Sequence, residues 1–221
     1  MKHLCIRLLN MTIGLILTAL GIILTIKANI GYAPWEVFHV GLSKAIGLSF
    51  GITTIIVGLV IVIIVTLLGE KFGFGTIASM VMTGIFADII LILDLIPIAD
   101  NFLIGILMLI AGLFIISLGT YFYIKTGYGV GPRDNLMVVL ARKTKLPVGF
   151  CRVIVEFFVT ATGWLLGGMV GIGTIISVIA IGFCIQITFT LLKFDVTEVK
   201  HESLGDTFNA IKLKMKTLEK D

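Results

Sequence analysis

Charged residues are scarce in this chain of 221 residues. Asp, Glu, Lys and Arg make up 14% of it, whereas a soluble domain carries about 25% of these residues. This excludes a soluble globular domain. The apolar residues, 58% of the chain, lie in blocks of about 18 to 25, the length of a membrane-spanning helix. Because backbone groups in lipid must be satisfied within each segment, the blocks predict an all-α fold, a polytopic transmembrane helical bundle.

Cysteine and histidine are equally few. Cys5, Cys151 and Cys184 are dispersed and form no CxxC pair, so the sequence predicts free thiols rather than a disulfide framework or a metal centre. The three histidines lie far apart, and no serine, histidine and acid come together in a hydrolytic pattern. We therefore expect no catalytic residues, no metal and no cofactor, in a protein that is not an enzyme.

A basic domain that could bind nucleic acid is also lacking. The net charge is +4, but most basic residues lie at the ends of predicted spans or in the C-terminal tail, where they fit an anionic cytoplasmic lipid surface. We therefore expect no nucleic-acid partner. Residues 1–7 are basic and then apolar, as in a signal peptide, but no small-x-small cleavage motif ends the apolar run. We expect this segment to belong to the fold.

Glycine, by contrast, is abundant, and its positions indicate an internal repeat. Gly31 and Gly129 lie 98 positions apart (129 − 31 = 98), as do Pro34 and Pro132. With this offset, eight of the eleven glycines between residues 14 and 84 fall on another glycine. The sequence therefore predicts a membrane domain that is built from two repeats.

Each repeat is predicted to contain four helices in the same order of lengths. The membrane domain is expected to span 1–193, with repeat one at about 8–95 and repeat two at about 102–193. The helices are expected at about 8–28, 34–46, 50–68 and 75–94, and at about 102–125, 132–144, 149–166 and 173–193. The second helix of each set is short: at 1.5 Å per residue it reaches about 20 Å, against a hydrocarbon core of about 30 Å.

The short helices decide the predicted topology. If they are half-helices, each repeat has three spans, six in all, and the repeats have opposite orientations. The alternative is eight spans with parallel repeats. In the six-span version Lys71 lies inside and Asp94 and Asp100 lie outside, which agrees with the excess of Lys and Arg in cytoplasmic loops. Lys44 lies outside in this version and does not agree with that rule. In the eight-span version Lys44 is inside but Lys71 is outside. Both versions place both termini in the cytoplasm.

The polar tail, residues 194–221, carries one further pattern. Five of its apolar residues are spaced by 4, 3, 4 and 3 positions and so share one helical face. They are Leu204, Phe208, Ile211, Met215 and Leu218. We interpret the tail as cytoplasmic, with an amphipathic helix that lies on the inner membrane surface or binds a partner helix. A basic tail without fixed structure remains the alternative.

Two charged pairs in the second repeat are candidate substrate-binding residues. Arg133 and Asp134 follow Pro132 at the start of the short helix. They form either a capped helix start with a local ion pair, or an anion site reinforced by the positive end of the helix dipole. Arg152 and Glu156 lie four apart on one face of the next span. They form either an internal salt bridge or part of the same site, and the two interpretations are compatible.

At the positions that correspond to Arg133 and Asp134, the first repeat has an acid but no arginine. It has Trp35 and Glu36 where the second repeat has Arg133 and Asp134. We therefore expect an asymmetric site, in which Trp35 and Glu36 supplement the charges of the second repeat. Asp88 is a further candidate, because it lies well inside a predicted span, where it either bridges helices or carries a proton.

Small residues mark the predicted helix starts, turns and contacts. The starts and turns are expected at Gly31, Pro34, Gly129, Gly131, Pro132, Gly173 and Thr174. The Gly-x-Gly-Thr turns lack the lysine of a phosphate-binding loop, so we expect tight turns with threonine caps rather than a nucleotide site. Four glycines at seven-residue spacing predict close packing of the long helices. They are Gly14, Gly21, Gly112 and Gly119.

The most specific motifs are Gly31-x-x-Pro34-Trp35-Glu36, Gly129-x-Gly131-Pro132-Arg133-Asp134-x-Leu136 and Arg152-x-x-x-Glu156. With these motifs the chain resembles the YczE/YyaS/YitT family of bacterial integral membrane proteins, in particular its YczE-like branch. The resemblance covers about residues 8–193 and implies a multi-pass protein of the bacterial plasma membrane. It implies no particular substrate. Glu36 departs conservatively from the family's PWD-like motif, and the soluble C-terminal domain of YitT-like members is not expected here.

The leading functional hypothesis is a transporter or permease for a small solute or a lipid head group. Its central polar site would contain Arg133, Asp134, Arg152 and Glu156, helped by Trp35 and Glu36. The expected partners are the lipid bilayer and a small anionic solute or lipid head group, because arginines bind carboxylate and phosphate. The alternative is a non-transporting membrane scaffold or regulatory protein that acts through its C-terminal tail.

Overall fold

The computed structural model describes residues 2–70, 72–195 and 199, and every regular element within them is an α-helix. This confirms the predicted all-α fold. The helices are α1 (Lys2–Lys27), α2 (Pro34–Ile46), α3 (Phe50–Leu67), α4 (Phe74–Leu93), α5 (Phe102–Ile124), α6 (Pro132–Thr144), α7 (Val148–Leu165) and α8 (Ile172–Leu191). Lys71 and the predicted amphipathic helix of the tail lie outside the described residues.

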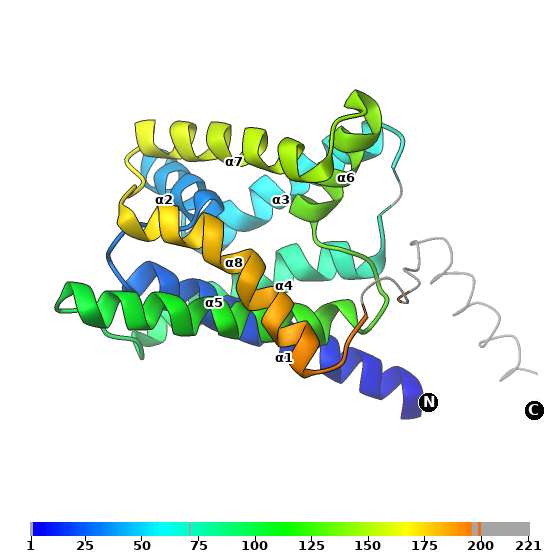
Figure 1. Cartoon of the computed structure of the whole chain (residues 1–221), viewed down its shortest axis with the longest axis horizontal. Coiled ribbons are helices and arrows are strands. Elements are labelled where there is room, and N and C mark those ends of the chain that lie inside the picture. Colours follow the sequence, from blue (N-terminus) through cyan, green and yellow to red (C-terminus); the bar gives the residue numbers. More distant parts are fainter. Residues whose placement is uncertain (1, 71, 196–198, 200–221) are drawn as a thin grey trace, which may run out of the picture.

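Six of the described helices are long and apolar enough to cross a membrane, whereas α2 and α6 have only 13 residues each. This matches the six-span version with two half-helices rather than the eight-span alternative. Figure 1 shows α6 at the end of the bundle where the N-terminus lies, and α2 toward the opposite end. The two short helices therefore lie at opposite ends of the bundle, as the six-span version requires.

Each short helix begins after a glycine-rich break that packs against a distant segment. Gly31 and Gly129 have φ angles of 113° and 119°, in the left-handed region that favours glycine. A Cβ atom on Gly31 would lie only 2.6 Å from the backbone nitrogen of Gly171. Pro34 and Pro132 occupy the first positions of α2 and α6, where a helix leaves the backbone N–H without a partner and proline's fixed φ is suitable.

The same breaks form hydrogen bonds with the first turns of α4 and α8. The N–H of Gly75 donates to the Tyr128 carbonyl at 2.8 Å, and the N–H of Gly173 donates to the Ile30 carbonyl at 2.7 Å. At the start of α8, the Thr174 hydroxyl accepts the N–H of Gly171 at 3.1 Å. The start of each short helix is thus held in place by a segment from the other half of the chain.

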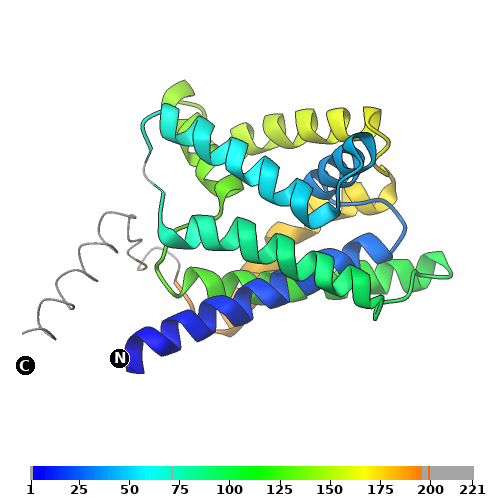
Figure 2. The same cartoon turned by 180° about the vertical axis from the view of Figure 1, so that it is seen from behind.

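The helices α1 and α5 form the most extensive helix contact among the described residues. Figure 2 shows α1 lying along α5, with α4 beside it. A Cβ atom on Gly14 would lie 2.7 Å from the Gly119 carbonyl oxygen, and one on Gly21 would lie 2.7 Å from the Gly112 carbonyl oxygen. Glycines therefore let the two backbones touch, which is how helices associate where lipid supplies no hydrophobic drive.

The two halves of the chain differ at one helix contact. α3 packs against α4, and a Cβ atom on Gly84 would lie 2.7 Å from the Gly51 carbonyl oxygen. α7 and α8 make no comparable contact, and nothing lies within 4 Å of a Cβ atom placed on Gly149 or Gly182. Figure 1 shows α8 running away from α7 toward the end of the bundle where α6 lies.

Replacing Gly14 by leucine is expected to destabilise the fold, because the backbone of α5 leaves no room for a side chain. Overpacking costs about 1–3 kcal/mol, and here the obstacle is backbone. Gly182→Leu is the matched control, because its side chain enters open space. In detergent, the Tm of Gly14→Leu should fall by at least about 3 °C while that of Gly182→Leu stays unchanged. Equal Tm values would contradict the α1–α5 contact.

Single cysteines at Ser43 and Thr144 are expected to react with a membrane-impermeant maleimide from opposite sides of the membrane. Ser43 lies in the last turn of α2, and Thr144 ends α6. Each variant carries no other cysteine, and the cysteine-free chain gives the background. Labelling of both positions from one side would contradict the six-span arrangement.

Candidate substrate site

A cavity of about 270 Å³ lies at the centre of the bundle and is lined by side chains from all eight described helices. Most of its wall is apolar, as at Leu15, Val57 and Leu113. Serine and threonine hydroxyls interrupt this wall at Thr18, Thr54, Ser79, Thr83, Thr120 and Ser177. Of the seven candidate residues, the six that line the cavity are Trp35, Glu36, Arg133, Asp134, Arg152 and Glu156.

The first turns of α2 and α6 both face this cavity. Pro34 and Pro132 line it, and each is followed two residues later by an acid, Glu36 or Asp134. The first N–H groups of a helix have no partner within the helix, and they carry the positive end of its dipole. Two positive helix ends and two carboxylates therefore meet at the centre of the bundle.

Arg133 joins the two short helices. Its Nη1 donates to Glu36 Oε1 at 3.1 Å, and its guanidinium carbon lies 5.0 Å from the centre of a Trp35 ring. The Glu36 side chain is 7% exposed and that of Arg133 is 30% exposed. Removal of Arg133 would leave a nearly buried carboxylate without its cation, which is strongly unfavourable. The pair therefore fixes the start of α6 against the start of α2.

His39 also contacts Arg133, although it is not among the site residues predicted from the sequence. Its Nδ1 lies 3.1 Å from Nη2 of Arg133. A guanidinium can only donate, so Nδ1 accepts and the ring proton lies on Nε2. His39 is 1% exposed, and its Nε2 has no hydrogen-bond partner among the described residues. The signal in the sequence is its spacing, because His39 lies three residues after Glu36 on the same face of a short helix.

Arg152 has fewer partners than Arg133. Its Nε donates to Glu156 Oε1 at 2.7 Å, as expected for residues four apart on a helix. No other hydrogen bond of this guanidinium is found within the described residues. The Arg152 side chain is 44% exposed, whereas that of Glu156 is 10% exposed. Both Nη groups of Arg152 are therefore available to an anion in the cavity.

Asp134 differs from the other two carboxylates of the cavity. The sequence allowed a local ion pair between Asp134 and Arg133, but Arg133 is paired with Glu36 instead. Within the described residues Asp134 has no salt bridge shorter than 4.0 Å, although it lies in the electrostatic field of both Arg152 and Arg133. Asp134 therefore lies near both arginines without forming a salt bridge to either within the described residues.

Asp88, the seventh candidate, lies away from the cavity wall. Its carboxylate accepts the N–H of Gly51 at 2.7 Å and the hydroxyl of Ser49. Both donors belong to the start of α3, where the first N–H groups have no helical partner. Of the two roles considered for Asp88, this geometry favours the bridging of helices, here α4 to the start of α3.

The fold and the cavity together define a class: multi-pass helical membrane proteins with a charged central site surrounded by their spans. The chain belongs to a family of unknown function, DUF6198, whose sequence profile matches residues 5–190. This agrees with the resemblance to the YczE-like branch.

Three bacterial relatives cover most of the chain. It is 33% identical over 175 residues to the uncharacterized membrane protein YczE of Bacillus subtilis, covering 78% of this chain and 80% of that protein. It is 30% identical over 184 residues to the uncharacterized protein YyaS of the same organism, covering 82% and 91%. An uncharacterized protein of Haemophilus influenzae is 28% identical over 186 residues, covering 82% and 84%. No solved structure matches the chain.

Double-mutant cycles should separate the two ion pairs. The cycle of Glu36→Gln with Arg133→Gln is expected to give a coupling of about 1–3 kcal/mol, because Glu36 is nearly buried. The cycle of Arg152→Gln with Glu156→Gln should give about 0.3–0.5 kcal/mol, because Arg152 is half exposed. Reversible unfolding in mixed micelles measures both. A larger coupling for the second pair would contradict the role assigned to Arg133.

Proposed function

We propose that the protein is a permease that carries a small anionic solute, or the anionic head group of a lipid, through the central cavity. The observation that carries the proposal is the meeting of two helix N-termini and two arginines in one cavity among the spans. Ionisable groups within a membrane are costly and commonly mark a substrate path. In transporters built from repeats, helix N-termini near mid-membrane commonly hold the anionic group of the substrate.

The two arginines have different roles in this proposal. Arg133 is held by Glu36, His39 and the Trp35 ring, so it keeps the half-helices together. Arg152 receives the substrate, because its Nη groups have no protein partner among the described residues. A guanidinium offers two parallel N–H donors to a carboxylate or phosphate, which gives both strength and orientation.

The balance of charge in the cavity suits binding followed by release. Two guanidiniums and three carboxylates line it, and each helix N-terminus contributes about half a positive charge. The sum is close to neutral, so an anion is neither repelled nor held irreversibly. At Arg152 it competes with Glu156, and one ion pair replaces another as the substrate comes and goes. Transport needs such a site, which is favourable enough to fill and weak enough to empty.

The contrasting function is a scaffold or regulator that acts through the C-terminal tail. The tail helix on which it depends lies outside the described residues, so no contact in the structure favours it. It also gives no reason for a half-exposed arginine beside a cavity within the membrane, because a purely structural charge is best paired and enclosed.

Reconstituted vesicles test the proposal. Vesicles loaded with radiolabelled phosphate, succinate or glycerol 3-phosphate are assayed for efflux, together with the lipid probe described below. Arg152→Gln is expected to lower the rate about 10- to 100-fold, because a hydrogen bond to a charged group is worth about 1.5–3 kcal/mol. Arg142→Gln is the matched control, because Arg142 pairs with Glu70 and is not a cavity residue.

Two outcomes would overturn the proposal. One is that no anion moves, the lipid probe included. The other is that Arg152→Gln and Arg142→Gln transport equally well. If deletion of residues 199–221 abolishes the cellular phenotype while Arg152→Gln spares it, the scaffold is favoured instead. Protein levels in the membrane are measured for every variant, so that lost folding is not mistaken for lost transport.

A further inference from the structure

We infer that the central cavity opens sideways into the bilayer between α7 and α8, and that the substrate is an amphiphile with one anionic head and one apolar chain. The head lies at Arg152, and the chain lies between the two helices. This inference rests on the proposed function and specifies its substrate class.

The opening lies between two helices that make no extensive contact, although the corresponding helices of the first half, α3 and α4, pack together. Gly84 of α4 touches Gly51 of α3, and Asp88 accepts the Gly51 N–H at 2.7 Å. At the corresponding positions of α7 and α8, Gly149 and Gly182 are exposed, with nothing within 4 Å of an added Cβ atom. The glycines that let α3 and α4 pack together thus have counterparts on α7 and α8, but these counterparts are not in contact.

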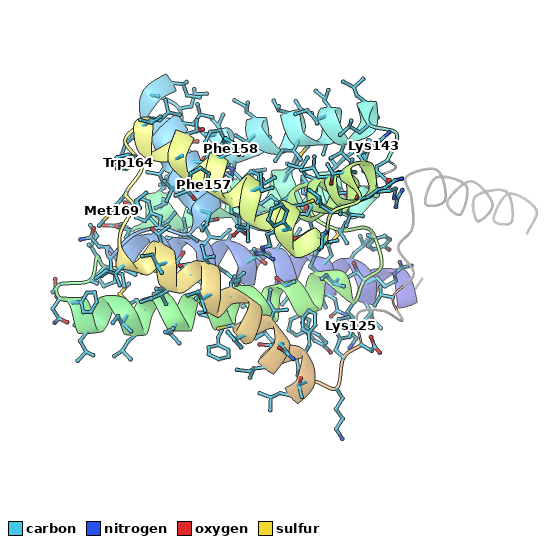
Figure 3. The ribbon with its side chains drawn as sticks, turned by 45° about the horizontal axis from the view of Figure 1, so that its top comes forward. Lys125, Lys143, Phe157, Phe158, Trp164 and Met169 are labelled. Carbon is cyan, nitrogen blue, oxygen red and sulfur yellow. The ribbon has the colours of Figure 1, made fainter. Side chains whose placement is uncertain are left out.

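The two helices at the opening have different neighbours. α7 packs against α2 and α6, whereas α8 packs against α5. α7 is the least buried of the six candidate spans. Phe157 and Phe158, labelled on α7 in Figure 3, are largely exposed and form a lipid-facing surface. The cavity is open over part of its surface and is lined by both helices, so the space between them borders lipid outside and the charged site inside.

The two sides of the opening have different chemistry. α8 contributes Val178, Ile181 and Ile185, whose spacing of 3 and 4 places them on one apolar face. α7 contributes Arg152 and Glu156. A fully polar solute would leave the α8 face without a partner, and a fully apolar molecule would leave the Nη groups of Arg152 unpaired. An anion that carries an apolar chain satisfies both sides.

The position of Arg152 along α7 fits this substrate. Arg152 is the fifth residue of the helix, which places it about 6 Å from the helix start. That depth is close to the head groups of the adjacent leaflet. An amphiphile in that leaflet can therefore reach Arg152 while its chain remains in an apolar environment, which avoids exposing methylene groups to water. A water-filled route to the same site would not avoid this exposure.

Photo-crosslinking tests where the chain lies. A photo-reactive amino acid at Ile185 is expected to capture radiolabelled lysophosphatidate in phosphatidylcholine vesicles, and Arg152→Gln should lower the yield about tenfold. The control position is Ile89 on α4, which is 45% exposed and is not a cavity residue. Capture of surrounding lipid at Ile89 should not depend on Arg152.

Transport rates distinguish a free phosphate ester from a lipid that carries the same phosphate head group. Glycerol 3-phosphate and lysophosphatidate differ only by the acyl chain, and a fluorophore on that chain lets quenching report the movement of lysophosphatidate across the vesicle membrane. We expect the protein to accelerate lysophosphatidate at least about tenfold more than glycerol 3-phosphate, because only the former fills the α8 face. Arg152→Gln should abolish this difference, and Arg142→Gln should preserve it.

The results separate the inference from the proposed function. If glycerol 3-phosphate moves as fast as lysophosphatidate, or if capture at Ile185 is independent of Arg152, the sideways opening for an amphiphile is wrong while the permease stands. If neither compound moves and Arg152→Gln changes nothing, the permease itself is wrong. Faster movement of lysophosphatidate together with Arg152-dependent capture at Ile185 supports both.

Discussion

The ion pair between Arg133 and Glu36 is the interaction on which the centre of this structure depends. The two residues are 97 positions apart and belong to the first turns of the two half-helices. A nearly buried pair contributes little net stability, because desolvation offsets much of its attraction, but loss of one partner is costly. Its effect is to fix one arrangement. With Arg133 on Glu36 and against Trp35, α2 and α6 both point their positive ends into the same cavity.

Because Arg133 is bound to residues of α2, the proposed function assigns the binding of the substrate to the second arginine. Arg152 lines the cavity and uses one nitrogen for Glu156, and its two Nη groups have no partner among the described residues. Neither half of the chain holds this site alone: the first half supplies an acid, a histidine and an indole, and the second supplies both arginines. The two arginines of the second half therefore differ in their contacts. Arg133 holds α6 against α2, whereas Arg152, within the part of the chain that the structure describes, bonds only to Glu156 of its own helix.

Local patterns predict more of this molecule than long-range ones do. Both short helices begin and end as expected, because glycine and proline mark where a helix can start. The pair of Arg152 and Glu156 follows from helical periodicity alone. The partner of Arg133 could not be predicted in this way, because the approach of Glu36 depends on how segments distant in the sequence pack. His39 could not be predicted as a site residue, because an isolated histidine suggests no ligand cluster and its neighbour Arg133 belongs to another helix.

The separation of α7 from α8 is the feature least accessible from sequence, because the residues that would close it are present. A sequence specifies which surfaces can pack, and Gly149 and Gly182 provide such surfaces, but it does not specify that they are in contact. A bundle that needed only to be stable would gain dispersion contacts by closing there, as α3 and α4 do at Gly51 and Gly84. The contact is instead left open beside Arg152, which has more unpaired donors than Arg133, the other arginine of the cavity. Stability does not account for that combination, whereas the passage of a substrate between the helices, as we infer it, would.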